Sequence, residues 1–539
     1  MTQNAMDDEV PVLIIGGSLV GLTTAMLLGL HGVRATAIER HAGTAIHPRA
    51  GHLQLRTLEI MRSAGLEPEL QRLSAERYFP NGGINLMRTI AGGEVASFIP
   101  DLNQGVEEFS PSRRLFIAQD ALEPLLRARA EELGAQLRYG AEVIGLEEGS
   151  DGVLATVRDL ATRDERTIRA SYVVAADGSR SPTRKRLGIG MSGYGELSRS
   201  ATIYFRADCR ELLAGTEFGV IYVDNEHLRG FFRFERALTA GFLAVNTLGD
   251  PTRPGALDVT TGLDEAGARQ LVRAAIGDPS VEVEIDDVAA WVATADVADR
   301  FQSGRILIAG DAAHLVPPNG GFGGNTGIQD AHNLAWKLAA VLRHGAGPGL
   351  LASYEAERRP VGRLTIEQAY SRYRHRVTPE LMDDDVPGLV DDFSMEIGYR
   401  YHSSAVIPDA GDESAAVVGH PRDAGGAPGT RAPHVWIAPE TSTLDAFGSG
   451  FVLLHGPDGA AWGDAAASVG EELGVPLSVV HEPADPDALA AAYGIGRSGA
   501  SLVRPDGFVA WRSPGPVSDP AAALREAFGR VLAIGSVER

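Results

Sequence analysis

Apolar runs separated by glycines extend over residues 10–32, and a further short apolar segment follows to residue 40. The run VPVLII at residues 10–15 is typical of a strand buried in a parallel sheet. VGLTTAMLLGLHG at 20–32 has the length of a helix that ends at Gly32, and RATAIER at 34–40 follows as a second strand. The pattern therefore predicts a strand–helix–strand unit over residues 10–40.

Two later segments combine an apolar strand with an acid and a glycine. The first is YVVAADGSRSPTRKRLGI at 172–189; the second, at 305–342, contains GDAAHLVPPNGGFGGN and leads into a long helix. Ligands bind beyond the carboxyl ends of parallel strands, and helix N-termini favour anionic groups. We therefore expect the strand ends at Gly16, Asp177 and Asp311 to converge on one cofactor.

The pattern changes between residues 190 and 299. Short, partly alternating segments such as SATIYFRAD and LRGFFRFE, separated by Gly, Asp and Asn, are typical of an antiparallel sheet. Tyr222 and Phe232 are candidate pocket residues in this region, although aromatic residues in strands more often belong to a core.

A linker rich in Gly, Pro, Ala and Asp begins near residue 405 and marks a domain boundary. Beyond it, apolar segments such as GFVLLHG and helical segments such as PAAALREAFGRVLA predict a small α/β domain. This domain contains no cysteine, which excludes a thiol redox role and favours a role in packing or assembly.

Composition narrows the classes of partner. A chain of 539 residues with 44% hydrophobic content can form two or three domains, and its net charge of -22, without a block of Lys or Arg, argues against nucleic acid. The single cysteine, Cys209, fits a reducing cytoplasm. The apolar run at 12–30 follows acidic residues and is broken by glycines, so it predicts neither a signal peptide nor a membrane span.

The segment IIGGSLVGL at 14–22 nearly matches the dinucleotide fingerprint G-x-G-x-x-G. Gly16 and Gly21 are present, but Ser18 occupies the middle position. Glu39, 18 residues after Gly21, stands close to where an acid binds a ribose hydroxyl. With a negative φ, Ser18 could be tolerated and could donate to a phosphate oxygen. A turn in which the glycines serve packing alone remains the alternative.

The sequence contains no motif for a metal site or for a serine hydrolase. His314 and His332 have no nearby partners at the spacing of metal ligands, and we predict no metal site. GGSLVG is not the G-x-S-x-G elbow of a serine hydrolase.

The fingerprint, DGSRSPTR at 177–184 and GDAAHLVPPNGGFGGN at 310–325 occur in the order found in class A flavoprotein aromatic hydroxylases. The chain resembles this family over about residues 10–375, and within it the bacterial hydroxylases of anthracycline, angucycline or tetracycline-type aromatic polyketides. The resemblance implies an α/β fold with four parts: a Rossmann-like FAD-binding domain (1–189 and 300–375), an antiparallel-sheet substrate domain (190–299), a helix end and linker (376–420), and a thioredoxin-like C-terminal domain (421–539).

The resemblance also implies an FAD site. Glu39 would bind the adenosine ribose, Arg49 would face the pyrophosphate or ribityl chain, Gln119 would touch the flavin chain, and Asp311 would bind the ribityl hydroxyls. Residues 323–325 would lie along the pyrimidine edge of the flavin. The full predicted set is Gly16, Ser18, Leu19, Val20, Glu39, Arg40, Arg49, Gln119, Asp177, Asp311, Pro318, Gly323, Gly324 and Asn325.

A helical stretch at 361–377 carries three arginines, Arg372, Arg374 and Arg376. A cation near a phenol lowers the pKa of the phenol and favours the phenolate that attacks an electrophilic oxygen. We therefore predict Arg372, Arg374 and Tyr222 as catalytic residues. The alternative for each arginine is a place on a solvated helix face.

The reaction implied by the resemblance is hydroxylation of a phenolic aromatic polyketide. NADPH or NADH would reduce FAD, O2 would add to give a flavin C4a-hydroperoxide, and the distal oxygen would be transferred to an electron-rich aromatic carbon. Two alternatives stay open: a Baeyer-Villiger-type flavin monooxygenase acting on a polyketide ketone, and a flavin- or ligand-binding protein without turnover. A small-molecule partner is expected, with no nucleic acid or membrane, and a homodimer is left open.

Overall fold

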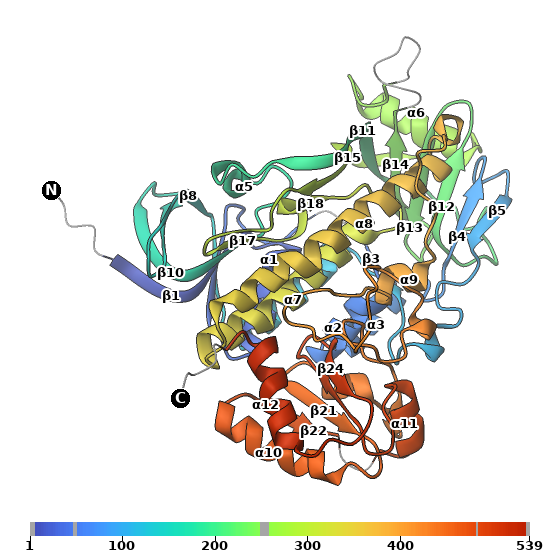
Figure 1. Ribbon diagram of the computed structural model, residues 1–539. Helices are drawn as coiled ribbons and strands as arrows, with labels where there is room; N and C mark the ends of the chain where they lie inside the picture. The colour runs from blue at the N-terminus through green and yellow to red at the C-terminus, as the bar shows by residue number, and fades with distance from the viewer. Residues whose placement is uncertain (1–5, 47–50, 248–257, 481–482, 535–539) are drawn as a thin grey trace.

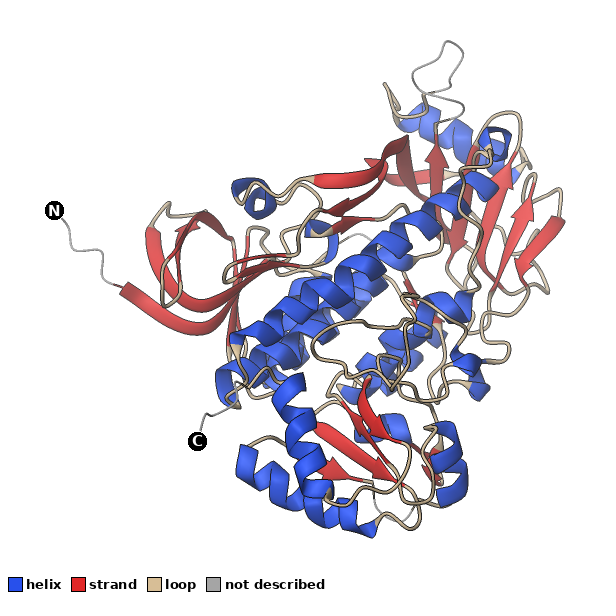
Figure 2. Ribbon diagram, viewed as in Figure 1, coloured by secondary structure: helices blue, strands red, loops and turns tan. Residues whose placement is uncertain are grey.

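Two large sheets and a smaller α/β unit make up the protein (Figures 1 and 2). The structure is a computed structural model that describes residues 6–46, 51–247, 258–480 and 483–534. Two long helices, α7 (Phe322–Arg343) and α8 (Ala352–Arg376), lie side by side, and α8 extends from the first sheet to the second.

The first sheet is mostly parallel and contains the predicted strand–helix–strand unit. Helix α1 (Leu19–Leu30) is buried almost all round, between this sheet and helices α4 (Gln119–Glu132) and α7. The register places Ile15, Ala175 and Ile308 side by side, so the loops after these three strands leave the sheet at one edge. The strands in spatial order are β16 (Gln302–Ser303), β17 (Ile306–Ile308), β10 (Glu165–Ala175), β1 (Met6–Ile15), β2 (Ala35–Glu39) and β7 (Gln136–Tyr139). Off this path, β9 (Val153–Asp159) pairs with β10, and β8 (Ala141–Glu148) pairs with β9.

The second sheet is mainly antiparallel, as the pattern at 190–299 predicts. Its far face packs on α6 (Glu265–Ile276), where Phe232 and Cys209 are fully buried, so Phe232 belongs to a core and not to a pocket. Burial raises the pKa of Cys209 to about 12. The strands in order are β18 (His314–Leu315), β15 (Glu284–Ala298), β11 (Met191–Arg206), β14 (Ala240–Asn246), β13 (Arg229–Phe234), β12 (Phe218–Asp224), β4 (Gly83–Met87) and β5 (Glu94–Ile99).

Two strands of this sheet come from outside the predicted range 190–299. Strand β4 pairs in parallel with β12, and β5 extends the edge beyond β4. Local alternation in the sequence does not report such a long-range pairing. A short antiparallel pair brackets these two strands in the chain: β3 (His52–Leu53) precedes β4, and β6 (Leu115–Phe116) follows β5. Helices α2 (Leu55–Ser63) and α3 (Glu67–Arg77) lie between β3 and β4 in sequence.

The C-terminal unit is a four-stranded mixed sheet with helices on both faces, an arrangement typical of thioredoxin-like domains. Helices α10 (Ala460–Leu473) and α12 (Pro520–Val531) cover one face, together with part of α7, and α11 (Pro486–Ala492) covers the other. The strands in order are β22 (Leu477–Val479), β21 (Phe451–His455), β23 (Ala500–Val503) and β24 (Val509–Ser513). The remaining short elements are α5 (Pro182–Arg186), α9 (Asp392–Ile397), β19 (Trp436–Ala438) and β20 (Thr441–Ser442).

A buried ionic cluster joins the C-terminal unit to the long helices. The carboxylate of Glu357 on α8 accepts hydrogen bonds from Lys337 Nζ at 2.8 Å and from Arg504 Nη1 at 2.6 Å. Asn333 and Ser403 donate to the same carboxylate, each at 2.6 Å. Glu357, Lys337 and Arg504 are all inaccessible to solvent, so their charges depend on one another.

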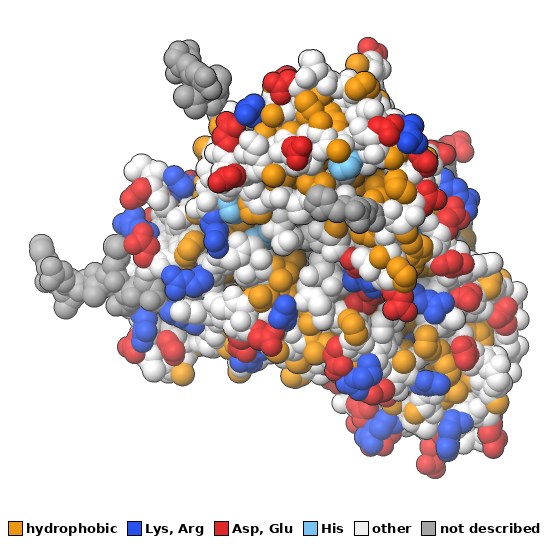
Figure 3. Space-filling view, turned by 90° about the horizontal axis from the view of Figure 1, so that it is seen from below, with side chains coloured by type: hydrophobic (Ala, Val, Ile, Leu, Met, Phe, Trp, Pro, Cys, Tyr) orange, Lys and Arg blue, Asp and Glu red, His pale blue; other side chains and the backbone are white. Residues whose placement is uncertain are grey.

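The surface carries charges of both signs. Figure 3 shows Lys and Arg side chains interspersed with Asp and Glu over one face, with small hydrophobic groups between them. None of the helices within the described ranges is long and apolar enough to cross a membrane.

We expect Arg504→Met to destabilise the protein by about 3–5 kcal/mol, because it removes the charge that compensates a buried carboxylate. Denaturant titration followed by circular dichroism measures the loss. The control is Arg525→Met, which breaks an ion pair with Glu472 whose side chains are roughly half exposed, and should cost at most about 1 kcal/mol. Equal losses in the two variants would contradict this account of the cluster.

Acid should weaken the same cluster. Burial alone would raise the pKa of Glu357, but Arg504 and Lys337 outweigh it and hold the pKa well below the ordinary value of 4.5. A carboxylate with a lowered pKa stabilises the fold above its unfolded-state pKa, and this stabilisation is lost as the pH falls below about 4.5. In Glu357→Gln we expect a less stable protein whose unfolding free energy depends less steeply on pH in this range, measured by denaturation at pH 3–7.

Candidate active site

A cavity of about 1940 Å³ lies between the strand ends of the first sheet and the near face of the second. Pockets for a drug-sized ligand commonly measure 300–1,000 Å³. The cavity therefore has room for a dinucleotide and a second small molecule. Glycine-rich turns and helix ends line one part of it, and aromatic and basic side chains line the other.

The fingerprint turn requires its glycines. Gly16 has φ +108°, and a Cβ there would overlap with the carbonyl oxygen of Ala176 on the neighbouring strand. A Cβ at Gly21 would overlap with the carbonyl oxygen of Gly16. The turn and the start of α1 can therefore approach this closely only with glycine at both positions.

Ser18 is tolerated because it adopts φ -100° in extended backbone. Its hydroxyl donates to Glu123 Oε1 at 2.5 Å and accepts from Gln119 Nε2 at 3.1 Å, instead of standing free for a phosphate. The buried Glu123 carboxylate also accepts from the backbone amides of Leu19 and Ala45. Sequence reasoning missed Glu123, whose only signal is its position one helical turn after Gln119 in QDALEP.

The end of β2 braces the same turn. Glu39 accepts hydrogen bonds from the amides of Gly17 at 2.7 Å and His41 at 2.8 Å, and both Glu39 and Arg40 line the cavity. Val20 is not among the cavity-lining residues, because it packs beneath Gly310 and Gly327. Arg49 lies outside the described residues.

The two acids that follow strands, Asp177 and Asp311, differ in whether their carboxylates already accept hydrogen bonds from the protein. Asp177 accepts from Ser181 Oγ at 2.5 Å and from the Thr183 amide at 3.0 Å, so it caps the short helix α5 while lining the cavity. Asp311 has no hydrogen-bond partner among the described residues and faces the cavity. The surrounding protein raises the pKa of Asp311 by desolvation. Asp311 is therefore the acid ready to bind a ligand hydroxyl.

A second acid fixes the turn that carries Asp311. Asp330 on α7 accepts from the Gly310 amide at 3.1 Å and lies 2.6 Å from His314 Nε2. Arg358 on α8 donates to its other oxygen at 2.8 Å. Although burial raises the pKa of Asp330, His314 and Arg358 outweigh this effect and lower it. The carboxylate thus stays charged and holds the turn between two helices.

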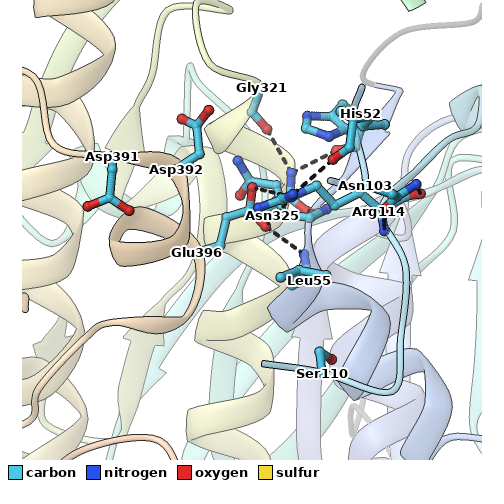
Figure 4. A network of polar contacts seen from close by, with 12 residues as sticks. His52, Leu55, Asn103, Ser110, Arg114, Gly321, Asn325, Asp391, Asp392 and Glu396 are labelled. Carbon is cyan, nitrogen blue, oxygen red and sulfur yellow. Dashed lines mark hydrogen bonds and ion pairs between the residues drawn. The ribbon is translucent and has the colours of Figure 1, made fainter. Parts of the chain in front are cut away.

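The N-terminus of α7 presents unpaired amides. Its N-cap is Gly321, which has φ +68° and no side chain for capping, and Pro318, Gly323 and Gly324 line the cavity beside it. A helix start of this kind favours an anionic or carbonyl edge. Asn325 has a different use: its amide nitrogen donates to the carbonyl oxygens of His52 at 2.8 Å and Gly321 at 2.7 Å (Figure 4). Asn325 therefore fixes this edge of the cavity.

The other part of the cavity has an aromatic floor on the second sheet. Tyr204, Phe242, Phe231 and Tyr222 form a chain of rings with centroids 5.8–6.1 Å apart. Arg376 Nη1 lies 3.4 Å from the hydroxyl of Tyr222, which makes Tyr222 a cavity residue with a basic neighbour.

Of the predicted arginines, Arg372 lines the cavity and Arg374 is not among its lining residues. Arg372 donates to Val390 O at 2.7 Å and Asp392 at 2.9 Å, whereas Arg374 donates to the hydroxyl of Tyr370. Residues four apart share a helix face and residues two apart do not. Arg376 therefore lies beside Arg372 on the cavity wall. Arg374 is the residue predicted for this position from the sequence.

The geometry is that of a dinucleotide site whose cavity continues into an aromatic part. The start of α7 without a side-chain cap, the unpartnered Asp311 and the glycine turn all suit FAD. The family model described as "FAD binding domain" matches residues 9–369, and that described as "Aromatic-ring hydroxylase, C-terminal" matches residues 425–533.

Similar proteins agree with this class. A 4-methyl-5-nitrocatechol 5-monooxygenase from a Burkholderia species is 61% identical, covering 98% of this chain and 98% of its own. Tetracenomycin A2 monooxygenase-dioxygenase from Streptomyces glaucescens is 38% identical, covering 98% and 97%. The crystal structure of aklavinone-11 hydroxylase with FAD and aklavinone has a TM-score of 0.91 at 36% identity, covering 98% and 99%.

The chain belongs to the FAD-dependent aromatic hydroxylases. The predicted family, the fold class and the flavin are thereby confirmed. The roles of the individual site residues remain predictions from their positions.

We expect Asp311→Ala to weaken FAD binding by about 1–3 kcal/mol, because a buried ligand hydroxyl loses its acceptor. Titration of the apoprotein with FAD, followed by flavin fluorescence, measures the change. Asp299→Ala alters an exposed acid that is not among the cavity-lining residues and should leave affinity unchanged. Unchanged affinity in Asp311→Ala would show that this acid does not contact the cofactor.

Proposed function

We propose that this protein uses NADPH or NADH and O2 to hydroxylate a phenolic ring. The observation that carries the proposal is the joining of two sites in one cavity: a dinucleotide site at the strand ends and an aromatic, arginine-lined pocket on the second sheet. FAD, once reduced and exposed to O2, supplies an electrophilic oxygen. The chain must then hold the phenol beside it.

The groups around Tyr222 suit the activation of a phenol. A guanidinium close to a phenolic oxygen favours the phenolate, and the ring of a phenolate is more nucleophilic than that of the neutral phenol. Arg376 contacts the Tyr222 hydroxyl and stacks against the rings of Phe98 and Tyr222, at 5.2 and 5.6 Å. Arg372 is held by Asp392 and stacks on Phe322 at 5.0 Å. A substrate oxygen near Tyr222 and Arg376 would therefore be held as, or close to, the phenolate.

The aromatic floor suits a flat ring and limits water. Tyr204, Phe231 and Phe242 present ring faces and edges over which a planar substrate can stack. Apolar walls keep water from the reacting oxygen, so reduced cofactor is used for transfer to the ring and not for release of peroxide.

Two types of phenol are candidates. The predicted substrate is an aromatic polyketide, and relatives named for such reactions are 38% identical. The relative at 61% identity is named for a nitrocatechol, which has a single ring. Because this identity is higher, a small phenol is added as a second candidate substrate. For both candidates the proposed reaction is hydroxylation: one oxygen atom is transferred to a carbon of the phenolic ring.

The first experiment measures NADPH and NADH oxidation by the FAD-loaded protein with a panel of nitrocatechols, simple catechols and anthracyclinones. We expect oxidation to be stimulated by at least one phenol and the product to gain a ring hydroxyl, located by NMR. Insertion of oxygen beside a ketone would indicate the Baeyer-Villiger alternative. Oxidation that no phenol stimulates would count against the proposal.

Arg376→Gln should lower kcat by about 10²-fold, the lower end of the range for positioned proton-transfer groups, and shift the pH profile upward. Loss of the cation leaves the phenol less ionised at neutral pH. Arg374→Gln is the matched control on the same helix, outside the cavity lining, and should stay within about threefold of wild type. Equal losses in the two variants would mean that the helix, not the cation, is responsible.

A further inference from the structure

Arg233 is a buried cation that lacks an acidic partner. It lies on β13, two residues after Phe231, so the two side chains share the cavity face of the sheet while Phe232 and Phe234 point into the core. Arg233 is only 6% exposed, and no carboxylate of the described residues lies within salt-bridge distance. Nη2 donates to the carbonyl oxygen of Gly51, and Nε has no partner.

Most other buried arginines in the described part of the chain form an ion pair with a carboxylate. Arg114 pairs with Glu396, Arg358 with Asp330 and Arg504 with Glu357. Arg184 donates to two carbonyl oxygens, with Asp177 nearby. Buried charges are rarely left without a partner, because desolvation costs several kcal/mol. The exception at Arg233 therefore requires an explanation, and its place on the cavity wall provides one.

Aromatic rings hold the guanidinium in position. Its Cζ lies 4.4 Å from the ring centroid of Tyr78 and 4.6 Å from that of Phe116. Burial lowers the pKa of Arg233 to about 10, so the group stays protonated at neutral pH. Stacking of this kind orients a guanidinium without neutralising it.

Within the described ranges, no carboxylate forms an ion pair with Arg233, and the groups in contact with it carry no negative charge. Burial, with Arg114 and Arg233, lowers the pKa of His52 to about 3, so His52 is neutral. Burial raises the pKa of Tyr78, which stays a neutral phenol. Arg77 is another cation, already paired with Asp120 and Glu235. On this part of the cavity wall, Arg233 is thus a cation with no ion-pair partner among the described residues.

We propose that Arg233 binds a negatively charged oxygen of the substrate, and so selects phenols that carry a second anionic or strongly electron-rich oxygen, such as nitrocatechols. The inference rests on the proposed function. Phe231, two positions before Arg233, pairs with Tyr222, and two residues of a strand span about 7 Å. A ring stacked on Phe231 therefore has Tyr222 and Arg376 to one side, across the strands, and Arg233 farther along β13.

The substrate is favoured over the cofactor as the partner of Arg233. The side chain belongs to the face that carries the aromatic floor, and Arg233 pairs across the strands with Phe242. The residues that suit FAD come from the first sheet and from the start of α7. A partnership with FAD is instead one outcome of the test.

The experiment uses 4-nitrocatechol as the probe, because its visible absorption reports whether the ring is ionised. The FAD-loaded enzyme is titrated with the probe between pH 5 and 9 without NAD(P)H, so no turnover is needed. We expect bound 4-nitrocatechol to ionise at lower pH than the free compound, and to bind at least about tenfold more tightly than catechol. The absence of both effects in the wild type would overturn the proposal.

Three variants separate charge from structure. Arg233→Gln should weaken 4-nitrocatechol binding by about 10- to 100-fold and catechol binding by less than about threefold, while Arg233→Lys retains most of the preference. The control is Arg236→Gln, which removes an exposed arginine that also donates to a carbonyl and stacks on a ring, but is not among the cavity-lining residues. It should match wild type.

The alternatives give different results. Equal losses of catechol and 4-nitrocatechol binding in Arg233→Gln would reduce Arg233 to a structural residue and overturn the proposal. Easier release of FAD with an unchanged preference for 4-nitrocatechol would assign Arg233 to the cofactor. If Arg233→Gln does not fold, the wild-type titration and Arg233→Lys decide. Failure of the proposed function is seen separately, as NAD(P)H oxidation that no phenol stimulates.

Discussion

Two adjacent charged residues on α8 link the C-terminal unit to the turn that carries Asp311. Glu357 faces Lys337 on α7 and Arg504 in the C-terminal unit, while Arg358 faces Asp330, which holds the turn at Gly310. All of these ionic groups are excluded from water, so each one needs its partner in place. The position of the C-terminal unit and the shape of the turn that carries Asp311 are therefore set by the same helix. The C-terminal unit is thus connected to this turn through α8.

The cofactor part of the site could be predicted because its signals are local. Glycines at sharp turns and acids just after strands are fixed by steric limits and by the common edge of a parallel sheet, both of which are visible in a short stretch of sequence. Ser18 posed the main question, and its answer is not local. The partner of its hydroxyl, Glu123, lies 105 residues away on another helix, and only the folded chain brings the two together.

The aromatic part of the cavity was harder to predict. Its lining depends on which face of a helix or strand each side chain occupies. On a helix, a two-residue error moves a side chain to another face, which is why Arg376 and not Arg374 joins Arg372 at the cavity. On β13, a one-residue step separates Phe232 in the core from Arg233 on the cavity wall. The pairing of β4 with β12 is long-range and leaves no local trace. Sequence patterns therefore located this sheet without showing which side chains face the substrate.

The burial of Cys209 has a practical consequence. It is the one cysteine in the chain, it is fully enclosed beneath the second sheet, and its raised pKa keeps it as an unreactive thiol. The natural protein thus offers a nearly blank background for thiol labelling. A cysteine introduced on α8 and another on the rim of the second sheet could each carry a fluorophore or spin label without first removing a native residue. The distance between α8 and the rim of the second sheet could then be followed while the enzyme works.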